Sequence, residues 1–114
     1  MSFHPSAHQA KIWFNKLNEM LFDGELEKPY VEIRRRQGIW GEGGHYGIDE
    51  DGNMKTFISL TNKFRDKNHF LSVLAHEMVH LYQFMVGDSG NHNELFYSFR
   101  EKFEENNLLL KRCY

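Results

Sequence analysis

A His-Glu-x-x-His pentad stands in the middle of a mainly apolar stretch, and this combination sharply limits the possible folds. The pentad runs from His76 to His80, and apolar residues surround it at helical spacing over about residues 68–86. They cover most sides of the expected helix: Phe70, Leu71, Val73, Leu74, Ala75, Met78, Val79, Leu81, Phe84 and Met85. Such a helix is buried between other elements. Three ionisable side chains within one helical turn are costly there unless they are paired or bind a cation.

The spacing of the pentad suits a zinc ion. Residues four apart in a helix are offset by about 40°, so His76 and His80 project from the same side. Two neutral imidazoles in this relation bind one zinc ion. Glu77 lies about 100° around the axis from His76, where it reaches a zinc-bound water without being a ligand. We therefore predict zinc as cofactor, His76 and His80 as ligands and Glu77 as general base. An exposed helix with two surface histidines is the alternative, which the apolar neighbours disfavour.

A catalytic zinc ion usually has three protein ligands and one open position. After His80 the candidates for the third ligand are Asp88, His92 and Glu94. We predict His92, because a reversal over residues 86–91 can bring the start of a third helix beside the pentad. Glu94 is the alternative third ligand, and otherwise it is expected to cap that helix or to orient a ligand.

Helices are also expected before and after the strands along the sequence. Ser6 and Gln9 form a capping box, and an amphipathic helix should follow over about residues 7–22. The third helix should open near Asn91 and present four apolar side chains to the core: Leu95, Phe96, Phe99 and Phe103.

Between the first two helices the period changes to that of strands. Residues 30–34 and 56–60 have strand character, and residues 38–53 hold six of the nine glycines. The run Asp49–Asn53 is a strong turn signal. We predict a small antiparallel sheet of three or four strands. The whole chain, residues 1–114, is then one α+β domain of zincin-like architecture, with about three helices on the sheet and the pentad on the central buried helix.

Composition excludes several classes of protein. The net charge of −2 argues against a protein that mainly coats nucleic acid. Two basic clusters, Arg34–Arg36 and Lys63–Lys67, could touch a phosphate or an acidic substrate, but solvated surface is the preferred interpretation. The only cysteine, Cys113, can form neither an intrachain disulfide nor a multi-thiolate zinc site. With no secretory leader and no apolar run of about 20 residues, a cytoplasmic location and no membrane partner are expected.

Two segments resemble the SprT-like zinc metallopeptidases, which include the protease domain of Spartan. The first is Leu74-Ala75-His76-Glu77-Met78-Val79-His80, and the second is Asn91-His92-Asn93-Glu94-Leu95-Phe96, which is similar to the family's segment that supplies the third ligand. The resemblance implies zinc ligation by His76, His80 and His92 and catalysis by Glu77. It also implies DNA-associated proteins as substrates, although the net charge does not favour direct DNA binding.

Many relatives carry a cysteine-bearing zinc module that engages DNA. With one cysteine, this chain is expected to be a minimal form that lacks this module. Its size is typical of a stand-alone bacterial or phage-encoded domain, the latter acting in the host cytoplasm.

The predicted activity is that of a zinc metalloendopeptidase. Glu77 would activate a zinc-bound water that attacks a peptide bond, and the protein or peptide substrate would lie extended along a strand edge. A non-catalytic zinc-containing module that binds protein or DNA is one alternative. Another is a hydrolase for a small amide or a nucleic-acid bond. A closed site, with Glu94 or Asp88 as fourth ligand, would favour the non-catalytic module.

Overall fold

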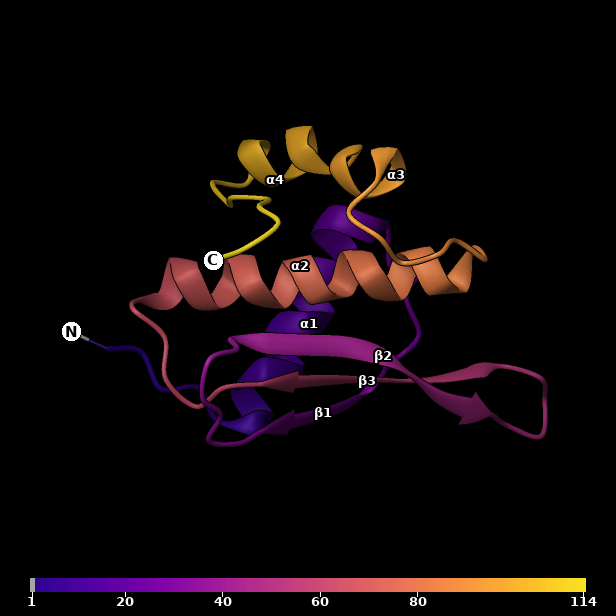
Figure 1. Ribbon diagram of the computed structural model, residues 1–114, viewed down its shortest axis with the longest axis horizontal. Coiled ribbons are helices and arrows are strands. Elements are labelled where there is room, and N and C mark those ends of the chain that lie inside the picture. Colours follow the sequence, from indigo (N-terminus) through magenta and orange to yellow (C-terminus); the bar gives the residue numbers. More distant parts are fainter. Residues whose placement is uncertain (1) are drawn as a thin grey trace.

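Two long helices pack on one face of a three-stranded sheet, and two short helices lie beyond them. The computed structural model describes residues 2–114. In chain order the elements are α1 (Ala7–Phe22), β1 (Tyr30–Ile33), β2 (Gly41–Ile48), β3 (Met54–Leu60), α2 (Lys67–Met85), α3 (Glu94–Tyr97) and α4 (Arg100–Glu105). Helix α2 lies over β2 and β3, while α1 contacts β1 and crosses behind α2 (Figure 1). The prediction of an α+β chain is confirmed.

The local signals for α1 are confirmed. The Ser6 hydroxyl accepts from the Gln9 backbone N–H at 3.1 Å, and the Gln9 side chain accepts from the Ser6 N–H at 2.9 Å. This capping box satisfies two N–H groups that the first turn leaves without helical partners. The helix ends at Asp23, whose left-handed backbone (φ 53°) stops it.

The sheet differs from the prediction, because it is mixed rather than antiparallel. Strands β2 and β3 form the expected antiparallel hairpin, but β1 pairs with β3 in parallel, and the strand order is β1-β3-β2. The central position goes to β3, whose residues Ile58, Ser59 and Leu60 are all buried. Residues 34–40 form a connection long enough to span about 10 Å, the width of two strand spacings. They carry the chain past the place that β3 later fills.

The third helix also differs from the prediction, because it starts later and is split into α3 and α4. Asn93 is extended and its side-chain oxygen accepts from the Phe96 N–H, so the helix begins only at Glu94. The Ser98 hydroxyl donates to the Leu95 carbonyl, a local bond that competes with the regular helical pattern. His92 therefore lies in a loop and not in the helix.

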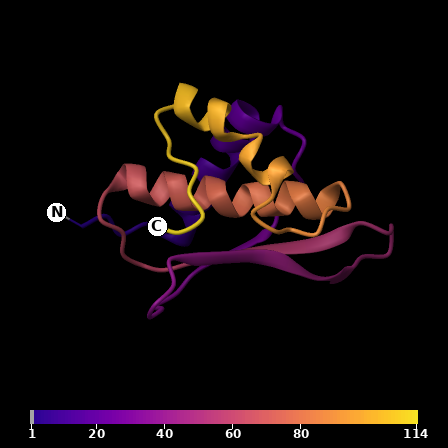
Figure 2. The same cartoon turned by 45° about the horizontal axis from the view of Figure 1, so that its top comes forward.

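After α4 the chain folds back onto α2. Leu108 and Leu110 are buried, and the Leu109 N–H donates to the Ser72 hydroxyl of α2 at 3.2 Å. Figures 1 and 2 show this segment descending from α4 to the middle of α2. Within residues 2–114, no helix has both the length and the apolar character needed to span a bilayer.

Candidate metal centre and cleft

Three histidines converge above the middle of α2. His76 and His80 project from the same side of the helix, and the loop before α3 brings His92 beside them. One ring nitrogen from each of the three lies within 4.8 Å of the other two. The Nε2 atom of His76 is 3.2 Å from Nε2 of His80 and 3.4 Å from Nε2 of His92. His76 is buried, whereas His92 is the most exposed of the three.

The other ring nitrogens fix the tautomers of the two helix histidines. His76 Nδ1 is 2.8 Å from the Lys111 carbonyl oxygen, and His80 Nδ1 is 2.8 Å from the Gln83 side-chain oxygen. Both oxygens can only accept, so both Nδ1 atoms carry the hydrogen. When neutral, each ring then presents an Nε2 lone pair. The 3.2 Å contact between the two Nε2 atoms therefore joins two acceptors, and it becomes favourable only with a cation between them.

This donor set fits a divalent metal ion. Tetrahedral zinc with Zn–N bonds of 2.0–2.1 Å places its nitrogen ligands about 3.3 Å apart, close to the observed 3.2 and 3.4 Å separations. Among residues 2–114, no carboxylate or thiolate joins the three histidines in this cluster. Glu94 is exposed on the first turn of α3. Asp88 instead accepts hydrogen bonds from Gln83, Gly90 and Asn93.

Gln83 connects His80 of α2 to the loop that carries His92. Its side chain is fully buried. The oxygen accepts from His80, and the amide NH2 faces three oxygens of the loop: Asp88 Oδ2 at 3.0 Å, the Asn91 carbonyl at 2.7 Å and Asn93 Oδ1 at 3.2 Å. These contacts also decide which side-chain atom of Gln83 is the nitrogen. One residue thus orients His80 and anchors the loop that carries His92.

Neither the Gln83 network nor the Lys111 contact was found from the sequence. Gln83 is three residues after His80, the spacing at which helical side chains meet, so a weak signal existed. Lys111 is 35 residues from His76 and contributes only its carbonyl, a group that every residue has.

Glu77 lies on the side of α2 that faces β2. Its Oε2 atom is 3.9 Å from His76 Nε2, and its side chain is buried. Burial, reinforced by the charge of Glu42, raises the pKa of the Glu77 carboxyl to about 8, while the Gly43 backbone and Arg36 oppose the rise. A carboxyl group with this pKa can hold or release a proton near neutral pH.

The histidines are shifted in the opposite direction. Burial and the neighbouring His80 lower the pKa of His76 to about 3. Burial also lowers the pKa values of His80 and His92. All three rings are therefore neutral at pH 7, which is the state that binds a metal ion.

A cleft of about 510 Å³ opens in front of these residues. His76, Glu77 and His80 of α2 line one wall and Gly41–Gly43 of β2 line the other. Trp40 lies at one end, and the segment Arg112–Tyr114 covers part of the rim. Because β3 pairs with only one side of β2, the other side is a free strand edge.

Three ring side chains, those of His45, Tyr82 and Tyr97, lie outside the cleft lining. The His45 ring packs edge-on against Phe84, with the ring centroids 5.1 Å apart. Tyr82 packs on Phe22 and Phe99, and Tyr97 packs on Phe96. A different tyrosine, Tyr114, lines the cleft with its ring centroid 5.4 Å from that of His76. No local pattern had indicated Tyr114.

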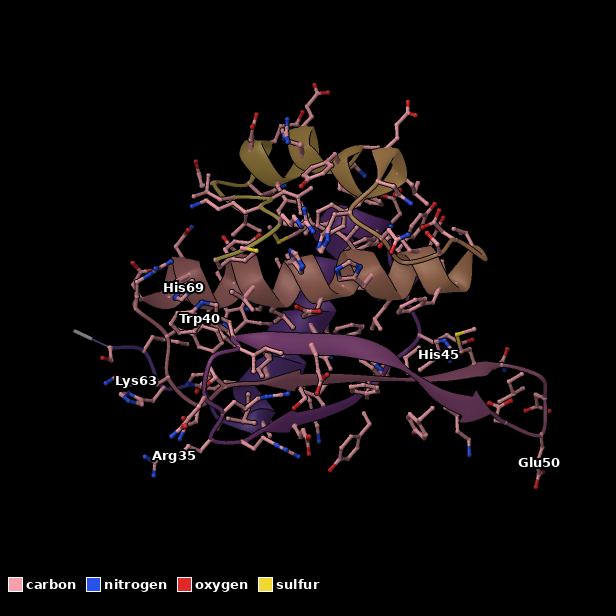
Figure 3. All side chains as sticks on the ribbon, viewed as in Figure 1. Arg35, Trp40, His45, Glu50, Lys63 and His69 are labelled. Atoms are coloured by element: carbon pink, nitrogen blue, oxygen red, sulfur yellow. The ribbon has the colours of Figure 1, made fainter. Side chains whose placement is uncertain are left out.

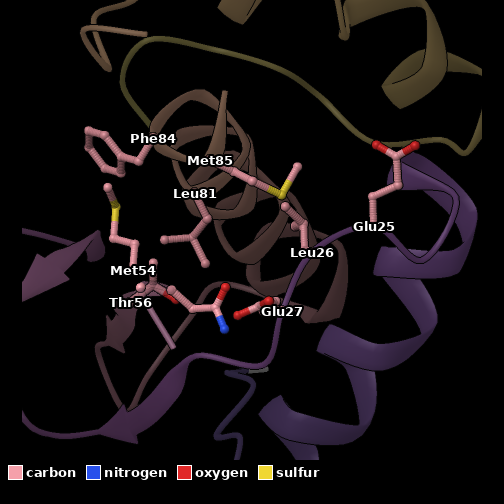
Figure 4. A pocket seen from close by; sticks show the side chains of 10 residues that line it. Glu25, Leu26, Glu27, Met54, Thr56, Leu81, Phe84 and Met85 are labelled. Atoms are coloured by element: carbon pink, nitrogen blue, oxygen red, sulfur yellow. The ribbon is translucent and has the colours of Figure 1, made fainter. Parts of the chain in front are cut away.

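A second pocket, of about 320 Å³, lies beneath the C-terminal end of α2 (Figure 4). Leu81 and Phe84 of α2 meet Met54 of β3 there, and Glu25 and Glu27 lie at its margin. None of its lining residues is a histidine or a cysteine. The candidate metal centre therefore belongs to the cleft and not to this pocket.

The sequence model of the SprT-like family matches residues 10–113. The chain belongs to the SprT-like family. In this SprT-like chain the matched range contains the pentad, the loop with His92 and the segment that folds back onto α2. No curated protein and no solved structure matches the chain.

Proposed function

We propose that this protein is a zinc-dependent metalloendopeptidase of zincin-like design. One observation carries the proposal. The Nε2 atoms of His76 and His80 lie 3.2 Å apart with both lone pairs directed to the same place, and His92 completes the cluster. His76, His80 and His92 would hold the zinc ion. With no fourth side-chain ligand in the described cluster, a position stays open, as catalytic zinc sites require.

Zinc held there would supply a Lewis acid that acidifies water and polarises a peptide carbonyl. The residues of the chain do the remaining work. Glu77 takes the proton of the attacking water and delivers it to the departing amide nitrogen. Its raised pKa suits this exchange, although the charge of a bound dication would lower that pKa. The Lys111 carbonyl and Gln83 keep His76 and His80 in the binding tautomer.

The free edge of β2 is the proposed substrate track. An extended peptide can pair with the backbone of such an edge, and this mode needs little side-chain recognition. Gly43 lets β2 approach α2 closely, because a Cβ atom at this position would lie 3.2 Å from the Glu77 carbonyl oxygen, and this brings the edge strand next to the Glu77 carboxyl. A substrate strand on this edge would pass beneath the three histidines.

The alternative of a non-catalytic zinc module is disfavoured by the side chains near the cluster. Asp88, the nearest unused carboxylate in the sequence, is engaged by Gln83, Gly90 and Asn93. A buried carboxyl with a raised pKa, such as that of Glu77, has no role in a purely structural site.

The test combines metal analysis with a cleavage assay. Purified protein should bind one zinc ion per chain and cleave casein or an unstructured peptide, and a chelator should abolish cleavage. Glu77→Gln should keep the zinc ion and lose at least about a thousandfold in kcat. Cleavage by Glu77→Gln at the wild-type rate would refute the proposal. Adding DNA, or offering DNA-bound proteins, tests whether such proteins are the preferred substrates.

A further inference from the structure

A basic groove adjoins one end of the cleft. It has a volume of about 490 Å³ and lies between the connection after β1 and the segment after β3. Arg35 and Arg36 come from the first segment, and Lys63 comes from the second. Figure 3 shows Arg35, Lys63 and Trp40 at one end of the molecule and Glu50 at the opposite end. The basic Arg35 and Lys63 therefore lie at one end of the molecule, and the acidic Glu50 lies at the other end.

The groove and the cleft adjoin each other. Gly38, Ile39 and Trp40 line both of them. Residues 38–40 immediately precede β2, so a chain that follows the free edge of β2 toward its start would leave the cleft past Trp40 and enter the groove.

Two cations of the groove are available to a ligand. Arg35 and Lys63 are exposed, and within residues 2–114 neither is within 4.0 Å of a carboxylate. Arg36 is already engaged, because it donates to the Ser59 hydroxyl and to Glu42, each at 2.8 Å. The groove thus has unpaired positive charge that an incoming carboxylate can neutralise.

The aromatic residue of the groove is not free to stack on a nucleobase. The Trp40 ring is stacked with Phe64, with centroids 6.0 Å apart, and the Arg65 guanidinium lies 5.7 Å from the Trp40 centroid. The His69 ring meets it edge-on at 4.4 Å. Proteins that bind single-stranded nucleic acid usually offer open aromatic faces. Together with the net charge of −2, this favours a protein ligand.

We propose that the basic groove selects acidic side chains in the substrate, on the side of the cleaved bond that runs past Trp40. This inference rests on the proposed peptidase function. The scissile bond should lie near Gly43, which faces Glu77. Because a strand advances about 3.3 Å per residue, Asp or Glu about three or four residues from the cleaved bond would reach Arg35 and Lys63.

The experiment compares three peptides that share one central sequence. One has two Glu residues three and four positions after the cleaved bond, one has them at the mirror positions before it, and one has Gln at all four positions. One acidic peptide should show a KM about tenfold below that of the Gln peptide at low salt, and the advantage should shrink at high salt. Which acidic peptide wins gives the direction of the substrate.

Arg35→Glu/Lys63→Glu should abolish this preference, so that the acidic peptide no longer has a lower KM than the Gln peptide. Lys11→Glu/Lys102→Glu alters exposed residues of α1 and α4 by the same net charge, and it should keep the preference. Equal KM values for all three peptides, or a preference that survives Arg35→Glu/Lys63→Glu, would overturn the inference.

A measurement of peptide binding tests this inference independently of the proposed peptidase function. Zinc-loaded Glu77→Gln with a fluorescent acidic peptide reports on the groove even if no peptide is cleaved. If the acidic peptide binds no more tightly than the Gln peptide, the groove proposal fails. It also fails if a short oligothymidylate displaces the acidic peptide and binds more tightly than it. If the acidic peptide binds and is never cleaved by wild type, the peptidase proposal alone fails.

Discussion

The two walls of the cleft are built on opposite principles. The helix wall, His76, Glu77 and His80 of α2, is buried in part or in full. His76 donates to the distant Lys111 carbonyl, and His80 donates to Gln83 of the same helix. The strand wall, Gly41–Gly43 of β2, has two glycines among its three residues and a free edge. The helix wall holds side chains in fixed positions, and the strand wall presents backbone N–H and C=O groups.

This difference shows how a small chain divides the tasks that the proposed peptidase function requires. Chemistry needs groups held in place before the substrate arrives, which the packed core around α2 provides. Recognition of many different peptides needs only a backbone ladder, which an edge strand provides. Substitutions in the helix wall should therefore change metal binding or proton transfer, and substitutions in the strand wall should change turnover alone.

The largest effect is expected for His76, the buried member of the proposed ligand set. His76→Ala should weaken zinc binding by on the order of a thousandfold, since a ligand is lost. Peptide cleavage should disappear with the metal. Zinc titration with a competing chelator measures the affinity. His8→Ala, at an exposed position of α1, is the control and should bind zinc like wild type. Equal zinc affinity for His76→Ala would mean that the helix wall does not hold the ion.

The next largest effect is expected for Gln83, which accepts a hydrogen bond from His80 and donates to the loop that carries His92. Gln83→Leu removes the acceptor of His80 and the contacts to the loop, and it should weaken zinc binding about ten- to hundredfold. NMR of the metal-free variant should show a change in the His80 tautomer. Gln83→Glu keeps an acceptor for His80 and should preserve the tautomer, while its carboxylate would repel Asp88.

Loss of stability alone must be separated from this role of Gln83. Asn18→Leu is the matched control, because Asn18 is also buried and its amide bonds both the N–H and the carbonyl of Leu26, at 3.1 and 2.9 Å. It should lower the unfolding temperature without changing zinc affinity. If Asn18→Leu weakens zinc binding as much as Gln83→Leu does, Gln83 has no specific effect on the ligands.

A third effect concerns proton binding by the helix wall. The pKa of Glu77 is about 8 in the folded chain against 4.5 for the ordinary carboxyl. From pH 6.5 to 8, folded Glu77 keeps a proton that the unfolded chain has released, so stability falls as pH rises. The metal-free protein should lose up to about 2 kcal/mol of unfolding free energy over this range.

Urea unfolding at several pH values measures this dependence. Glu77→Gln should remove the loss and be more stable than wild type at pH 8. Below pH 6.5 the sign reverses for His76, whose folded pKa is lowered to about 3. There the unfolded chain binds the extra proton, so His76 destabilises the fold as pH falls. Identical pH profiles for wild type and Glu77→Gln would show that the Glu77 pKa is not raised.

The smallest effect is expected in the strand wall. A Cβ atom at Gly43 would lie 3.2 Å from the Glu77 carbonyl oxygen and 3.4 Å from its Oε1 atom. Gly43→Ala should therefore shift Glu77 slightly and lower kcat about tenfold, with zinc affinity unchanged. Gly47→Ala, on the same strand with no heavy atom within 4 Å of the added Cβ, should behave like wild type. Weaker zinc binding by Gly43→Ala would contradict the expectation that the strand wall affects turnover alone.

The sequence predicted what depends on neighbours along the chain. The Ser6–Gln9 capping box, the buried face of α2 and the turn at Asp49 are local patterns, and each is present in the structure. His92 could be chosen because few ligand types follow His80 within a short turn.

What the sequence did not predict depends on distant partners. The parallel pairing of β1 with β3 joins residues 27 positions apart, such as Tyr30 and Phe57, and alternation along a strand does not reveal its partner. The later start of α3 follows from Asn93, a residue whose side chain contacts Asp88 as well as Phe96. Backbone groups such as the Lys111 carbonyl have no signature of their own.

The hydrogen bond from His76 to the Lys111 carbonyl sets an order of events during biosynthesis. All three histidines leave the ribosome before Lys111 does. Until the segment after α4 folds back, no acceptor holds His76 Nδ1, and the ring can turn or exchange its proton between its two nitrogens. A nascent chain that stops short of Lys111 therefore has every proposed zinc ligand but no acceptor for His76 Nδ1, and we expect the proposed peptidase activity only after this segment has folded onto α2.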